Sequence, residues 1–274
     1  MRRFSTVFYS SWVVILLVTV SCSKFRKIQK STDWKVKYEA ALKYYDEKEY
    51  YKANVLLEEI LPIIRGTAEA EKANFIYAYS YYYQKQYILS AHYFKLFTDV
   101  YGRSEMVEEG SYMHANSLYK QSPQPSLDQT STYEAISALQ NFLNRYPLST
   151  YADEAESQIN ELQVKLERKA YESAKLYYQL RRYKAALIAL GNFHLDFPDS
   201  KFNEELHYLE IETAYDLANV SIKDKQEERY RKAVELYQDF VDDYPTSTYL
   251  RDAEKIYADC IKQLTTFADQ NQNQ

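Results

Sequence analysis

The apolar residues of the chain recur at helical spacing, and one pattern of them occurs five times. Ala186, Leu190, Phe193 and Phe197 follow one another at intervals of four, three and four, which places them on one face of a helix that Pro198 then ends. The four equivalent sets are Ala53, Leu57, Ile60, Ile64; Phe94, Phe97, Tyr101; Ala135, Leu139, Phe142, Tyr146; and Ala233, Tyr237, Phe240, Tyr244. Five copies of one pattern predict a helical repeat protein.

A second helix precedes each of these helices, so the repeating unit is a helical pair. Ala41, Ala78 and Ala174 stand at a fixed offset before the turn, and such small residues let two helices approach closely. Helix, tight turn and helix, closed by proline or a substitute, resembles the tetratricopeptide (TPR) repeat. The closing residues are Arg65, Gly102, Pro147, Pro198 and Pro245. We therefore predict an all-α fold, a right-handed α-solenoid of five TPR-like helical pairs plus a C-terminal capping helix.

The composition agrees with long helices. The chain of 274 residues has 30 Tyr but only 4 Gly and 6 Pro, so it holds few residues that break helices. Tyrosine by itself favours strands. Here the tyrosines stand among Ala, Leu, Glu and Lys at helical spacing, and the pattern outweighs the propensity.

The later units exceed the roughly 34 residues of a standard TPR, which predicts three insertions. The first is a loop, Ser122–Gln129, stiffened by prolines and with Asp128 placed to cap the next helix. The second, residues 150–180, contains no breaker and is predicted to be one long helix that acts as a rigid spacer. The third, around residues 221–228, is predicted to be a charged loop.

The N-terminus has the pattern of a bacterial export signal, with a basic start, an apolar run over residues 12–20 and then Cys22. Residues 18–22 resemble the lipobox at which a lipoprotein is cleaved and acylated, which makes Cys22 the predicted lipidation site. Thr19 departs from that pattern, since an aliphatic residue is usual there. A retained membrane anchor and ordinary secretion are the alternatives.

These features divide the chain into five segments. They are a signal peptide (1–21), a lipidated basic linker (22–33), an N-terminal TPR sub-array with the first three repeats (34–147), a C-terminal sub-array with the long helix, the last two repeats and the cap (148–266), and a disordered tail (267–274).

The formal net charge is −5, and removal of the signal peptide takes away Arg2 and Arg3, which leaves the chain more acidic. This charge argues against nucleic acid as a partner. The segment 23–37 is locally basic, and two interpretations stay open: it lies near anionic lipid headgroups, or it is a solvated linker. Cys260 is predicted to be a small buried helix residue rather than a reactive thiol.

No motif in the sequence points to catalysis or to a cofactor. There is no Gly-rich phosphate loop, no HExxH and no nucleophile with a nearby base. The histidines are scattered among the repeats without the spacing of metal ligands: His92, His114, His194 and His207. We therefore predict no enzyme, no cofactor and no metal site, and instead a surface of stacked helices that holds peptides or protein segments.

Neighbouring tyrosines on a helix point in different directions, so some of their rings are exposed. An exposed aromatic surface can pack against an extended peptide and donate hydrogen bonds to it, although each ring can equally serve to pack helices together. The candidate partner-binding residues combine tyrosines with the loop and the fourth turn: Tyr44, Tyr45, Tyr77, Tyr81, Tyr82, Ser122, Pro123, Pro125, Asp128, Gln129, Tyr178, Arg181 and Arg182.

Two runs of residues carry a resemblance to a known family. They are Asp128-Gln129-Thr130-x-Thr132 with Ala135 downstream, and the run from Tyr177 to Ala186. Together with the lipobox and the five TPR-like units, they resemble the BamD family, the lipoproteins of the outer-membrane β-barrel assembly machinery. The resemblance covers the chain from Cys22 to about Leu264.

The resemblance implies a non-enzymatic lipoprotein on the periplasmic face of the outer membrane, where it works with the other subunits of the assembly complex. Its N-terminal repeats would receive unfolded outer-membrane proteins through their C-terminal targeting strand. Its C-terminal repeats would dock the POTRA domain of a BamA-like β-barrel subunit. Because the repeats alone fit many TPR lipoproteins, an adaptor for a cell-wall or secretion complex is the alternative function.

Overall fold

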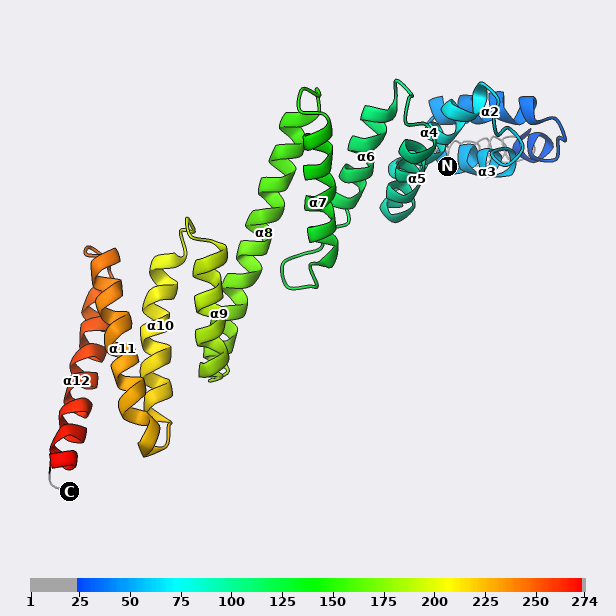
Figure 1. Cartoon of the computed structure of the whole chain (residues 1–274). Helices are drawn as coiled ribbons and strands as arrows, with labels where there is room; N and C mark the ends of the chain where they lie inside the picture. Colours follow the sequence, from blue (N-terminus) through cyan, green and yellow to red (C-terminus); the bar gives the residue numbers. More distant parts are fainter. Residues whose placement is uncertain (1–23, 273–274) are drawn as a thin grey trace, which may run out of the picture. The chain divides into compact units, whose positions relative to one another are not determined.

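Every regular element in residues 24–272, the part of the chain that the computed structural model describes, is a helix (Figure 1). A short helix over residues 24–29 comes first. The helices that follow are α2 (Trp34–Asp46), α3 (Tyr50–Ile60), α4 (Glu69–Tyr83), α5 (Tyr87–Val100), α6 (Val107–Tyr119), α7 (Thr130–Arg145), α8 (Ala152–Gln179), α9 (Tyr183–Asp196), α10 (Asn203–Asn219), α11 (Lys223–Asp243) and α12 (Leu250–Gln272). The predicted all-α class is confirmed.

Consecutive helices pack against each other in pairs, and each pair is one repeat. α2 packs on α3, α4 on α5, α6 on α7 and α10 on α11, while α12 packs on both α10 and α11. In the fourth repeat, α8 meets α9 through Ala174, Leu190 and Phe193, which belong to one buried cluster. The predicted TPR-like pairing is therefore confirmed.

The core register predicted from the sequence is also confirmed. In the first repeat, Ala53, Leu57, Ile60 and Ile64 are each at most 1% exposed. The last member of the other four sets follows the end of its helix, and its N–H donates to the C=O four residues back at 2.8–2.9 Å; these residues are Tyr101, Tyr146, Phe197 and Tyr244. Each aromatic ring thus closes one repeat at the C-terminus of its second helix.

The described residues form two compact units that divide within α8, after Leu162, and the loop residues 124–126 belong to the second unit. α8 is one continuous helix of 28 residues, as predicted. Its first half contributes Ala155 and Ile159 to the core of the first unit, and its second half contributes Ala174 to a core of the second. The predicted boundary between the sub-arrays, at residues 147–148, lies before this helix and not within it. Periodicity alone does not show that the two halves of one helix belong to two cores.

Two predictions of irregular structure are wrong. The charged segment around residues 221–228 is mostly helical, since α11 begins within it. No Gly or Pro interrupts it, and ion pairs along the helix, such as Lys225 with Glu228 at 3.0 Å, support it. The predicted tail from residue 267 is likewise helical as far as Gln272, because its Ala and Gln residues favour helix and no breaker interrupts them.

Serine side chains set the turns between repeats. Four serines donate their N–H to the C=O three residues back, and their Oγ atoms accept the N–H two residues ahead at 3.0–3.2 Å; these are Ser104, Ser149, Ser200 and Ser247. The contact satisfies an N–H group at the start of the next helix, which otherwise lacks a partner. The same device thus connects one repeat to the next at three places and the fifth repeat to α12 at a fourth.

The predicted signal peptide, lipobox and Cys22 lie outside the described residues. Within residues 24–272, no helix combines the length and the apolar character needed to cross a bilayer. The predicted linker is folded where it is described: the ring of Phe25 lies 5.7 Å from that of Tyr44, and Gln29 donates to Glu59 at 3.2 Å. This part of the segment therefore packs on the first repeat, while its basic side chains Lys24, Arg26, Lys27 and Lys30 remain exposed.

Candidate protein-binding surfaces

The paired tyrosines occupy one structural position, the last turn of the first helix, in three different repeats. The pairs are Tyr44-Tyr45, Tyr81-Tyr82 and Tyr177-Tyr178. Their carbonyl groups accept the N–H groups of the turn that follows, at 2.8–3.0 Å. In each turn one residue has a positive φ: 61° at Lys48, 60° at Lys85 and 56° at Arg181. The pairs thus belong to a recurring helix-ending turn, which the spacing of residues in the sequence does not show.

The second tyrosine of each pair also packs on the first residue of the next helix. The ring centroids of these contacts lie 5.6 Å apart for Tyr45 and Tyr50, 5.5 Å for Tyr82 and Tyr87, and 6.2 Å for Tyr178 and Tyr183. Tyr82 additionally accepts a hydrogen bond from the amide of Asn116 at 3.1 Å. These rings therefore hold the two helices of a repeat together, and all three are half-buried.

Tyr77 is the buried member of an aromatic wall in the first unit. It is 3% exposed, and its hydroxyl shares a hydrogen bond of 2.9 Å with that of Tyr81. The ring of Tyr81 stacks on that of Tyr93, with 5.2 Å between centroids and 12° between planes. Burial raises the pKa of Tyr77, so its hydroxyl stays protonated. Tyr77 thus holds the rings of this wall in place.

A cavity of about 720 Å³ adjoins this wall, and we call it the aromatic groove. Its lining combines apolar residues with three polar ones: Leu61, Pro62, Gly66, Tyr77, Tyr93, Leu96, Phe97, Val100, Tyr101, Glu58, Arg65 and Asn74. Leu96 and Val100 are 44% and 61% exposed, so the apolar surface is open to solvent. An apolar lining with a few polar groups is typical of a binding site.

The predicted loop at residues 122–129 is confirmed, and it is fastened to the neighbouring helices. Asp128 accepts the N–H of Thr130 at 2.9 Å, which supports the start of α7 as expected. Gln129 is 3% exposed and accepts the hydroxyl hydrogen of Thr132 at 2.7 Å, so it acts inside the fold. Ser122 also shares a hydrogen bond of 2.7 Å with Thr132. Pro123 and Pro125 are half-buried, and the exposed part of the loop lies around Asp128.

The turn between α8 and α9 presents a mixed apolar and basic surface, which we call the fourth-turn surface. Arg181 and Arg182 are exposed there. Leu176 and Leu180, which precede them in sequence, are 53% and 59% exposed. Tyr178 is half-buried, and its burial, followed by the charge of Glu212, raises its pKa to about 12. Apolar side chains next to arginines are a combination found at interfaces between proteins.

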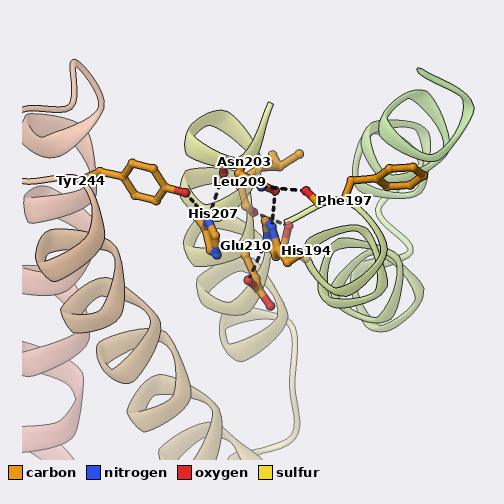
Figure 2. Close-up of polar contacts among 8 residues, drawn as sticks. His194, Phe197, Asn203, His207, Leu209, Glu210 and Tyr244 are labelled. Atoms are coloured by element: carbon orange, nitrogen blue, oxygen red, sulfur yellow. Dashed lines mark hydrogen bonds and ion pairs between the residues drawn. The ribbon is translucent and has the colours of Figure 1, made fainter. Parts of the chain in front are cut away.

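Two of the histidines do not fit the prediction that they are scattered. His194 and His207 stack with 3.6 Å between ring centroids and 4° between ring planes, and Glu210 lies beside them (Figure 2). Sequence spacing did not reveal the pair because the two residues lie on successive helices. Cys260, by contrast, is fully buried as predicted, and burial raises the pKa of its thiol to about 12.

Most of the chain matches a known protein family. The profile of the YfiO family, described as outer membrane lipoprotein, matches residues 30–201 and 177–267. A relative from Aquifex aeolicus (strain VF5) is described as a putative outer membrane protein assembly factor BamD. It is 28% identical over 236 residues, which cover 85% of this chain and 74% of the relative. The matched regions include the aromatic groove, the loop and the fourth-turn surface.

Proposed function

Because the chain belongs to the YfiO family of outer membrane lipoproteins, we propose that it is a non-enzymatic scaffold of the complex that assembles β-barrel proteins in the outer membrane. The name of the Aquifex relative, an outer membrane protein assembly factor, supports this role. Cys22 is proposed to carry the lipid that holds the chain at the periplasmic face of that membrane. The helical repeats then serve as binding surfaces in the periplasm.

The aromatic groove is the observation that carries the proposal. Its tyrosine wall and the exposed Leu96 and Val100 offer apolar contacts to the side chains of an extended segment. Arg65 lies at the same groove and is exposed, so its guanidinium is available to a carboxylate. This combination suits the C-terminal strand of an unfolded β-barrel protein, which ends in a free carboxylate. We assign substrate binding to the first unit on this ground.

The fourth-turn surface is proposed to dock the POTRA region of the barrel subunit. Leu176 and Leu180 supply apolar contact area, and Arg181 and Arg182 supply charged hydrogen bonds at its rim. Tyr178 supports this surface from its half-buried position. The exposed part of the loop around Asp128 is proposed as a further contact with a subunit of the complex.

Substitution of Arg65 tests the assignment of the groove. We expect Arg65→Glu to weaken binding of a peptide with the C-terminal sequence of a β-barrel protein about tenfold, because a hydrogen bond to a charged group contributes about 1.5–3 kcal/mol. Fluorescence anisotropy of the labelled peptide measures the affinity. Arg145→Glu is the matched control, since it makes the same charge change on an exposed arginine of the first unit outside the groove.

An amidated peptide separates the carboxylate from the rest of the segment. It should bind the unchanged protein as weakly as the free acid binds the Arg65→Glu variant. Equal losses in the Arg65→Glu and Arg145→Glu proteins would show that only net charge matters and would remove the groove assignment. Normal levels of outer-membrane barrels after depletion of the protein would instead favour the adaptor for a cell-wall or secretion complex.

A further inference from the structure

Three side chains that bind transition metals come together in the second unit (Figure 2). His194 lies in the last turn of α9. His207 and Glu210 lie three residues apart on α10, which places them on the same face of that helix. One nitrogen of each histidine and one carboxylate oxygen all lie within 4.8 Å of one another. None of these residues takes part in the proposed protein-binding surfaces.

The hydrogen bonds of Asn203 fix which nitrogen of His194 carries the proton. The amide Nδ2 of Asn203 donates to the C=O groups of Phe197 at 2.9 Å and Pro198 at 2.7 Å. Its Oδ1 therefore faces Nδ1 of His194, at 2.9 Å. An amide oxygen only accepts, so Nδ1 carries a hydrogen, and in the neutral ring the lone pair is on Nε2. This Nε2 is buried and forms no hydrogen bond within the described residues.

His207 is oriented in the same way. Its Nδ1 lies 3.0 Å from the backbone C=O of Asn203 and 3.1 Å from the hydroxyl of Tyr244. The carbonyl only accepts, so Nδ1 carries the hydrogen here too, and the lone pair is again on Nε2. Histidines that bind metals typically donate their other N–H to a carbonyl, which fixes the orientation of the ring. Asn203 thus orients both imidazoles.

Glu210 adds a negative charge with little compensation. Its Oε2 lies 3.6 Å from Nε2 of His194, and both side chains are 15% exposed. This is the only ion pair that Glu210 forms within residues 24–272. A largely buried carboxylate costs free energy unless a cation or hydrogen-bond donors neutralise it.

An acidic cavity provides access to this cluster from the side of α11. It has a volume of about 380 Å³ and is lined by His207, Glu210, Leu236, Asp239, Asp242 and Asp243. Several carboxylates in one concave site attract cations from solution. The cavity therefore leads a cation toward His207 and Glu210.

We propose that His194, His207 and Glu210 bind one divalent transition-metal ion of the zinc class, through Nε2 of each imidazole and the carboxylate. Water or an aspartate of the cavity completes the tetrahedral shell. The ion links α9 to α10 and thereby fastens the fourth repeat to the fifth. The two rings stack in parallel, whereas a metal lies near the plane of each ring that binds it, so binding tilts at least one ring and lengthens its Nδ1 hydrogen bond.

Titration of the full-length protein in detergent, after removal of metals by a chelator, tests the site. We expect one equivalent of Zn²⁺ by isothermal titration calorimetry and a rise in melting temperature of about 5 °C or more at saturating Zn²⁺. Co²⁺ should give the visible absorption of a tetrahedral ion with nitrogen and oxygen ligands. Glu210→Gln, which keeps the shape of the side chain, should weaken Zn²⁺ binding about tenfold or more, whereas His92→Gln, which replaces an exposed histidine outside the cluster, should leave it unchanged.

The result is decisive in either direction. Equal Zn²⁺ affinity in the Glu210→Gln and unchanged proteins would overturn the proposal, because the ion would then bind elsewhere. Absence of a tetrahedral Co²⁺ spectrum in the unchanged protein would overturn it without recourse to any variant. Far-UV circular dichroism of each metal-free variant establishes that it is folded, and His207→Gln serves as the second ligand variant if Glu210→Gln is not.

Discussion

The aromatic groove of the second repeat and the acidic cavity of the fifth are built on the same register but have opposite chemistry. Counted from the closing tyrosines Tyr101 and Tyr244, Leu96 and Val100 in the groove correspond to Asp239 and Asp243 in the cavity. Both repeats have a buried phenylalanine four residues before the closing tyrosine, namely Phe97 and Phe240. The comparison teaches that the core residues define a repeat and that a few exposed positions beside them define what it binds.

The largest expected effect tests whether the cores of the two repeats are built in the same way. Phe97→Ala and Phe240→Ala each remove a ring that is 1% exposed at the same position of the register. Each should lower the free energy of unfolding by about 3–5 kcal/mol, because a cavity remains in the core. Chemical denaturation measures the loss, and hydrogen exchange assigns it to one unit. A loss of less than about 1 kcal/mol in the free energy of unfolding of either variant would contradict equivalent core positions in the two repeats.

A smaller effect tests the close approach of paired helices. Ala186 lies on α9 and is fully buried. Ala186→Leu should destabilise the second unit by about 1–3 kcal/mol, because the added carbon atoms force the helices apart. Ala53→Leu, at the equivalent position of the first unit, should cost a similar amount there. An unchanged melting temperature in both variants would mean that the register is wrong.

The turns allow stability and binding to be separated. Lys85 and Arg181 have φ values of 60° and 56°, a conformation that glycine adopts without strain. Lys85→Gly and Arg181→Gly should therefore each raise stability slightly, by up to about 1 kcal/mol. Only Arg181→Gly should also weaken the complex with the barrel subunit, since Arg181 belongs to the fourth-turn surface. Surface plasmon resonance and thermal melting together check this prediction, and equal binding by both variants would sink the role of Arg181.

The smallest effect depends on pH. Burial, partly opposed by the hydrogen bond from Tyr208, raises the pKa of Glu212, with Asp216 and Asp252 acting in the same direction as burial. A raised carboxyl pKa favours the folded state at low pH, and this contribution is lost as the pH rises through the folded pKa. Glu212→Gln should therefore stabilise the second unit at pH 7 and not at pH 4. Glu156→Gln changes an exposed residue of the first unit, and its effect on the melting temperature should be the same at pH 7 and at pH 4.

The sequence was sufficient to predict the parts of the fold that depend on a regular pattern. Ala53, Leu57 and Ile60 are buried as their spacing requires, and the absence of a breaker correctly indicated the long α8. Charge without a breaker was misinterpreted as a loop at residues 221–228, where ion pairs between neighbouring turns support a helix instead. Helical pattern is local, so it can be predicted; the end of a helix depends on contacts that spacing does not show.

The binding surfaces were only partly accessible to the same reasoning. Tyr77 and Gln129 are predicted to bind a partner because of their polar side chains, yet both are buried and hold neighbouring residues in place. The aromatic groove was not predicted, because the register leaves Leu96 and Val100 out of the core but does not show that their exposed side chains line one cavity. Counting back from the closing residue Tyr244 in the same register gives Asp239 and Asp243, so the sequence does contain a signal for the acidic cavity. His194 and His207 come together only through packing, which the sequence does not display.

Photocrosslinking in intact cell envelopes tests the central claim most directly, that the two units bind different partners. A photoreactive amino acid replaces Leu96 in the aromatic groove or Arg182 on the fourth-turn surface, both of which are exposed. We predict that position 96 captures unfolded β-barrel proteins and that position 182 captures the barrel subunit of the assembly complex. Capture of the same protein at both positions, or of no β-barrel protein at position 96, would contradict the account.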